Sequence, residues 1–178
     1  MIRLYDDLAA RLGSAAPAVV PTLARLVFAG VLLVYFLNSG WGKIGTGLLS
    51  PDIGAFYQIF PKQVAAANGD LSQFGVFPRL IILAGTIGEI VLPLLIVFGL
   101  LTRLAALGMI GFVAIQTATD ISGHGTDATT IGRWFDTYSD ALIADQRAFW
   151  LLALVTLVLM GAGPLSIDRL IRGRSTPV

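Results

Sequence analysis

One apolar stretch, residues 79–103, constrains the fold more than any other part of the chain. Arg79 and Arg103 enclose 23 residues in which Glu89 is the only charged side chain. A helix of that length, rising about 1.5 Å per residue, is about 35 Å long and can cross a bilayer core of about 30 Å. The sequence therefore predicts a membrane-spanning helix with an acid near its centre.

Glu89 is the first candidate for a functional residue. An ionised side chain at the bilayer centre costs about 2.5–3.5 kcal/mol, so an acid there normally has a partner or a role. Pro93 removes the N–H that would bind the carbonyl of Glu89, which predicts a kink beside the acid. Gly85 and Gly88 allow another helix to approach closely. Two interpretations stay open: a packing kink with a protonated, hydrogen-bonded Glu89, or a site for binding or proton handling.

The composition extends the membrane assignment to the whole chain. Hydrophobic residues make up 56% of the 178 positions and charged residues only 13%, whereas soluble domains average about 25% charged residues. The mean hydropathy is +0.81. The absence of cysteine excludes disulfides and thiolate metal sites. A net charge of +1 without a basic patch gives no indication of nucleic acid binding, and His124, the one histidine, does not predict a metal site.

The hydropathy pattern predicts an all-α membrane protein with a single domain over residues 1–178. Its expected architecture is an antiparallel four-helix transmembrane bundle with short helices in the outer loops. The predicted spans are residues 21–43, 79–101, 104–120 and 148–163, and the predicted outer loops are residues 44–78 and 121–147.

Two segments outside the spans also have helical patterns. Residues 52–67 are rich in Ile, Phe and Tyr, so we expect short helices that meet at Pro61 and cover the outer mouth of the bundle. The alternative is an amphipathic loop helix without a ligand role. Residues 1–12 favour a short amphipathic helix on the membrane surface, ended by residues 13–17, with a frayed terminus as the alternative.

The positive charges predict the orientation. Seven Lys and Arg residues lie in the N-terminal segment, the hairpin at Arg103 and the C-terminal tail, against five in or beside the two long loops. By the positive-inside rule, both termini are expected in the cytoplasm.

A polar layer is expected at one depth inside the bundle. Counting about 1.5 Å per residue from the inner boundary places one polar or amphipathic side chain of each span roughly 20 Å up. Each needs a hydrogen-bond partner in hydrocarbon, so we expect all four to turn inward. These side chains are Tyr35, Glu89, Gln116 and Trp150.

Two further polar residues belong to the first span. Asn38 shares a helix face with Tyr35. Lys43 is expected about 12 Å higher than Glu89, so direct pairing would need a bent first helix or a chain of waters. Without a close cation, desolvation would keep Glu89 largely protonated.

Several motifs, in this order and spacing, resemble DoxX-like membrane proteins. They are GWGKI at residues 40–44, Glu89 followed by GLLTRLAA at residues 99–106, and GPLSID at residues 163–168. The resemblance extends roughly over residues 23–170. It implies a four-helix bundle in the bacterial inner membrane, with Lys43, Glu89, Arg103 and Asp168 as family-type residues. Arg103 and Asp168 are expected to fix topology and the C-terminal turn.

Members of the wider DoxX group include membrane subunits of thiosulfate:quinone oxidoreductase and proteins implicated in redox or metal stress. The leading hypothesis is therefore a redox-linked or stress-response membrane subunit, possessing no catalytic centre of its own, that binds a quinone-like molecule. The chain lacks ligand sets for haem or iron–sulfur clusters, so electrons would come from a quinone or a partner protein. Two alternatives are a scaffold that recruits a partner through its outer loops and a small ion or metabolite carrier that uses Glu89.

Overall fold

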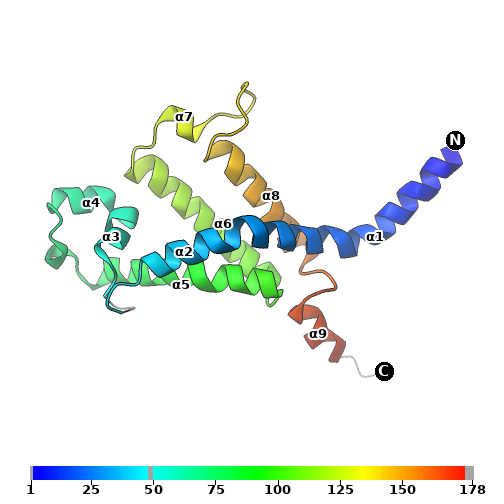
Figure 1. The fold of residues 1–178 in the computed structure, drawn as a ribbon, viewed down its shortest axis with the longest axis horizontal. Helices are drawn as coiled ribbons and strands as arrows, with labels where there is room; N and C mark the ends of the chain where they lie inside the picture. The colour runs from blue at the N-terminus through cyan, green and yellow to red at the C-terminus, as the bar shows by residue number, and fades with distance from the viewer. Residues whose placement is uncertain (1, 48–49, 175–178) are drawn as a thin grey trace.

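The computed structural model describes residues 2–47 and 50–174, and these residues form helices joined by short connections (Figure 1). The predicted all-helical class is confirmed. The α-helices are α1 (Ile2–Phe28), α2 (Val34–Gly42), α3 (Ile53–Ile59), α4 (Pro61–Ala66), α5 (Val76–Phe98), α6 (Thr102–Ala118), α7 (Ala128–Ile131), α8 (Ala144–Met160) and α9 (Ile167–Arg174). The π-helical segments are η1 (Ala29–Leu33) and η3 (Thr119–Gly123), and η2 (Leu71–Gln73) is a 3₁₀ turn.

The first helix is longer than expected. α1, η1 and α2 follow one another without a break, so one helical rod of 41 residues runs from Ile2 to Gly42. The predicted interruption at residues 13–17 is wrong. Pro17 lies inside α1, and the carbonyl that it leaves without a helical partner belongs to Gly13, which is exposed, so solvent can replace the missing bond. The N-terminal part of α1 projects away from the other helices (Figure 1).

In the part of the chain that the structure describes, three helical segments are long and apolar enough to cross a membrane: Ile2–Gly42, Val76–Phe98 and Thr102–Gly123. α8 has 17 residues, or about 26 Å of helix, which is shorter than a typical hydrocarbon core. The four-span arrangement therefore remains a prediction. In the structure α2 packs on α5, α5 on α6, α6 on α8, and α8 on α1 (Figure 1).

The helices pack around an apolar core. Phe28, Leu32 and Phe36 point inward from the first rod and meet residues of α5, α6 and α8. The outer faces keep large apolar side chains exposed, as expected for helices whose surroundings are lipid. The other buried members of this core are Ile96, Ala105, Ala106, Met109, Val113, Leu154 and Leu157.

Residues 53–66 form the two predicted short helices. α3 ends at Ile59 and Pro61 opens α4, where its missing N–H is not needed. Phe56 and Val64 are fully buried against Ile82 of α5. This second small core fixes the two short helices against the first turns of α5.

A network of hydrogen bonds joins the helix ends where α5 turns into α6. Buried Arg25 donates to the carbonyls of Ile96 and Val97 in α5, and to those of Ala162 and Leu165 beyond α8. This arginine satisfies carbonyls that helix ends otherwise leave open.

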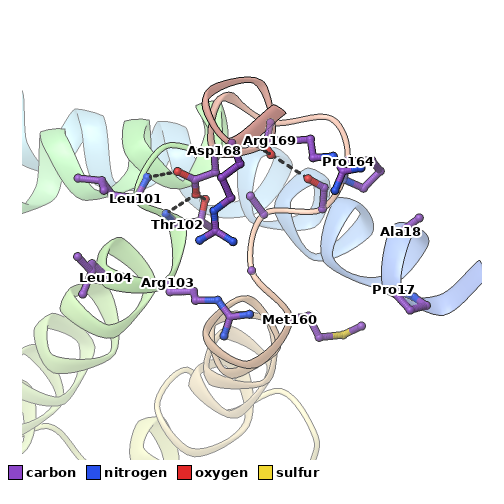
Figure 2. Close-up of a pocket in the computed structure, with 15 residues that line it drawn as sticks. Pro17, Ala18, Leu101, Thr102, Arg103, Leu104, Met160, Pro164, Asp168 and Arg169 are labelled. Carbon is purple, nitrogen blue, oxygen red and sulfur yellow. Dashed lines mark hydrogen bonds between the residues drawn. The ribbon is translucent and has the colours of Figure 1, made fainter. Parts of the chain in front are cut away.

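Asp168 supplies further hydrogen bonds to this network. It accepts hydrogen bonds from the N–H groups of Leu101 and Thr102, at 2.8 and 3.0 Å, and from the Thr102 hydroxyl at 2.9 Å (Figure 2). Arg103 donates to the carbonyl of Val158, 2.9 Å away. Asp168 therefore caps α6, and Arg103 joins α6 to the end of α8.

Candidate functional site

The most buried charges form an ion pair between α2 and α5. Lys43 Nζ lies 2.5 Å from Glu89 Oε2, and the two side chains are only 3% and 5% exposed. Ser39 Oγ donates to Glu89 Oε1 at 3.0 Å and accepts from Lys43 Nζ at 2.8 Å. The three side chains thus close a small polar network in an apolar environment.

This pair corrects the expectation for Lys43. A gap of about 12 Å was predicted from a straight helix, but the lysine ammonium reaches Glu89 directly. Side chains on a helix lean toward its N-terminus, and α2 and α5 run antiparallel (Figure 1), so the two side chains lean toward each other. Lys43 Nζ also donates to the carbonyl of Ser39, one turn back along α2. The expectation for Glu89 assumed that no cation lies close to it, and Lys43 is in contact with its carboxylate.

Gly40 permits the close approach of the two helices. It is buried, and a Cβ at this position would lie 2.7 Å from Cγ1 of Ile90 and 3.3 Å from Cβ of Glu89. A larger residue would separate α2 from α5 at the level of the ion pair.

A cavity of about 500 Å³ opens beside the ion pair, between α3, α5 and α6. Glycines give it room: nothing lies within 4 Å of a Cβ built at Gly111, and Gly85 and Gly88 also border the space. Its apolar walls come mainly from Ile59, Ile81, Leu92, Phe112 and Ile115, and its polar groups from Lys43, Gln58, Glu89, Gln116, Thr119 and Asp120. A mostly apolar cavity with a few polar groups is typical of a small-molecule site.

The predicted polar layer divides into two groups. Gln116 Nε2 donates to the Tyr35 hydroxyl at 2.7 Å, and the Tyr35 ring lies 5.7 Å from that of Trp150. The buried Oε1 of Gln116 has no hydrogen-bond partner among the residues that the structure describes. Glu89 and Gln116 border the same cavity, whereas Asn38 is exposed and outside its lining.

A second ion pair was not expected from the sequence. Arg147 of α8 pairs with Asp120 of η3 and donates to the Thr117 hydroxyl at 2.6 Å. Its guanidinium also lies 5.9 Å from the Trp150 ring centre. Asp120 is the last residue of the predicted span 104–120, and Arg147 is the last residue of the predicted loop 121–147. The available signal was that each falls within one turn of a predicted span, where opposite charges on neighbouring helices can meet.

α3 lies at the outer end of the cavity. Gln58 Nε2 is 3.4 Å from Ser39 Oγ, and the Gln58 carbonyl is 3.0 Å from His124 Nε2 in the connection after η3. α3 is thereby attached both to the ion-pair network and to the end of α6. Ser39 could have been found from its position four residues before Lys43, on the same helix face.

Within residues 2–47 and 50–174, no group of three or more His, Cys, Asp or Glu side chains could hold a metal ion. A model of the DoxX family matches residues 20–124, a range that contains Lys43, Glu89 and Gln116. No curated protein and no solved structure matches the chain.

Proposed function

Since the chain belongs to the DoxX family, we propose that it is a redox-linked or stress-response membrane subunit whose cavity beside Glu89 binds a quinone-like molecule. The observation that carries the proposal is the buried Lys43–Glu89 pair at the edge of an apolar cavity. A volume of about 500 Å³ falls within the usual range for small-molecule sites.

The lining suits a flat, mostly apolar ring that carries oxygen atoms. Lys43 can donate to a carbonyl oxygen, and Gln116 has a buried amide oxygen that can accept from a hydroxyl. The Phe112 ring and the aliphatic walls contact the apolar part. Reduction of the quinone takes up protons, and Glu89 can pass a proton to a quinone oxygen because its carboxyl group borders the same space. Electrons come from a partner protein in this proposal.

In the proposed arrangement four antiparallel spans form a bundle in the bacterial inner membrane, with α8 as the fourth. The packing of α8 against α1 and α6 supports this arrangement. The lipid bilayer surrounds the bundle.

The binding proposal is tested with purified protein in mild detergent and a short-chain ubiquinone, using tryptophan fluorescence. Gly111→Val should narrow the cavity without touching the ion pair, and we expect it to weaken the quenching of tryptophan fluorescence by the quinone. Gly13→Val is the matched control, because Gly13 is also helical with nothing within 4 Å of an added Cβ.

Glu89→Gln keeps the shape of the side chain and removes the titratable carboxyl. We expect this variant to fold, with a lower stability because Lys43 loses its carboxylate partner, and to fail in complementing a deletion strain. Full complementation, or equal quinone binding by the wild type and Gly111→Val, would contradict the proposal.

A second candidate function is recruitment of a partner protein. Trp134, Phe135 and Tyr138, in the connection between α7 and α8, are all exposed. Exposed aromatic residues in a loop are frequent in protein interfaces. If they bind a partner, a chain that co-purifies with the wild type should be lost from Phe135→Ser while quinone binding is unchanged.

A further inference from the structure

A second cavity lies at the opposite end of α5 and α6 from the first, where α5 turns into α6 and α8 ends. It has a volume of about 630 Å³ and is bordered by α1 at Pro17 and Ala18, by the start of α6, and by α9 (Figure 2). Three arginines border it: Arg103 at the start of α6, and Arg169 and Arg172 on α9. We call it the arginine cavity.

The charges of this cavity are unbalanced. Among the described residues that line it, the one acid is Asp168, whose two oxygens already accept from Leu101 and Thr102 (Figure 2). In the part of the chain that the structure describes, ion pairs are formed by Lys43 with Glu89 and by Arg147 with Asp120, so none of the three arginines has a carboxylate in contact. Three guanidinium groups thus border the cavity with one carboxylate, whose charge acts on Arg172 and offsets only part of the positive charge.

Apolar side chains border the same cavity. Leu101, Leu104 and Met160 line it and are all exposed. They lie where the apolar parts of α5, α6 and α8 end, which is the level of the membrane boundary for spanning helices. A soluble anion would leave these apolar surfaces uncovered, whereas a phospholipid carries both a phosphate and acyl chains.

We propose that the arginine cavity binds the phosphate group of an anionic phospholipid, with its acyl chains along Leu104 and Met160. Guanidinium groups match phosphate oxygens with two parallel hydrogen bonds, which makes arginine well suited to this contact. α9 also has the character of a short surface helix, with exposed Leu170 beside the two arginines. The site is separate from the cavity beside Glu89.

The test compares two double variants of the full chain with equal loss of charge. Arg169→Gln/Arg172→Gln alters the arginine cavity but leaves Arg103 in its contact with Val158. Arg3→Gln/Arg11→Gln is the control, because both residues are exposed on the projecting part of α1. Delipidated protein in mild detergent is titrated with dioleoyl phosphatidylglycerol or phosphatidylcholine, and bound lipid is counted by native mass spectrometry.

The wild type and the control should prefer phosphatidylglycerol, and the cavity variant should bind it roughly tenfold more weakly. The proposal is overturned if the cavity variant binds phosphatidylglycerol as the wild type does, if the control loses as much, or if phosphatidylcholine binds equally well. Displacement of the lipid by millimolar inorganic phosphate would also overturn it, because the ligand would then be the free anion. If the double variant does not fold, Arg169→Gln alone is titrated against Arg3→Gln with the same criteria.

Discussion

At the scale of single residues, the Lys43–Glu89 pair predicts that the effects of replacing its two members on the free energy of unfolding are not additive. Removing one charge leaves the other buried and unpaired, which typically costs about 3–5 kcal/mol. We therefore expect Glu89→Leu and Lys43→Met each to lower the free energy of unfolding by that order. The double variant should lose much less, because no charge stays buried.

Unfolding in mixed detergent and dodecyl sulfate micelles measures this cycle. Additive losses in the double variant would show that the two side chains do not interact. Quenching of tryptophan fluorescence by the quinone, measured on the same four proteins, separates stability from binding. The double variant is expected to fold and to bind the quinone poorly.

The turn between α5 and α6 requires a glycine at position 99. Its φ of 69° is left-handed, and an added Cβ would lie 2.5 Å from Cβ of Ser166 and 2.9 Å from Cζ of Arg25. Gly99→Ala should destabilise the protein by about 2 kcal/mol or more, through backbone strain and displacement of Arg25. The control Gly13→Ala, in an exposed helical turn, should be neutral or stabilise by about 0.5–1 kcal/mol. Thermal unfolding in detergent distinguishes the two, and equal midpoints would contradict the role given to Gly99.

At the scale of elements, the cap that α9 supplies to α6 predicts a pH dependence. Partial burial acts to raise the pKa of Asp168, but hydrogen bonds from Thr102 and Leu101 and the charge of Arg172 outweigh it, so the pKa lies below its ordinary value of 3.8. The carboxylate then stabilises the folded state fully above about pH 4, and this contribution is lost as the pH falls through the lowered pKa.

As the pH falls below about 4, through the lowered pKa of Asp168, Asp168→Asn should lose less thermal stability than the wild type. Circular dichroism melts in detergent measure it. Parallel curves for the two proteins would exclude the cap as a source of acid sensitivity.

The elements also show how far sequence reasoning extends. Long apolar runs were enough to predict α5 and α6, because a segment in lipid must satisfy its backbone as a helix. The aromatic and aliphatic content of residues 52–67, with Pro61 between two helices, was enough to predict α3 and α4. The continuation of α1 through Pro17 was missed, since the exposed carbonyl of Gly13 that Pro17 frees can bind solvent instead, and the sequence does not show this exposure. The Lys43 contact was missed because depth counting ignores the lean of side chains. The pairing of Arg147 with Asp120 was not predicted, because the position of each charge beside a predicted span does not say which opposite charge it meets.

At the scale of the whole molecule, the proposed topology places both termini in the cytoplasm and both long loops outside. Cysteines introduced at Asp70 and Asp127 should react with an impermeant thiol reagent in intact cells, and one at Arg174 should not. The chain has no cysteine of its own, so labelling reports only these positions. Labelling of Arg174→Cys in sealed cells would show the opposite orientation. The arginine cavity would then face the lipids of the other leaflet.

The π-helical turn η1 has a consequence for the evolution of the site. A helix advances roughly 100° per residue, so one surplus residue in a single wide turn changes the direction of everything that follows. Deleting one residue from Ala29–Leu33 would restore a regular α-helix and rotate α2 by that angle. Ser39, Gly40 and Lys43 would then turn away from Glu89 together. The polar network therefore depends on how α2 is rotated about its axis relative to α5. Deletion of a single codon can abolish the network without altering any residue that forms it.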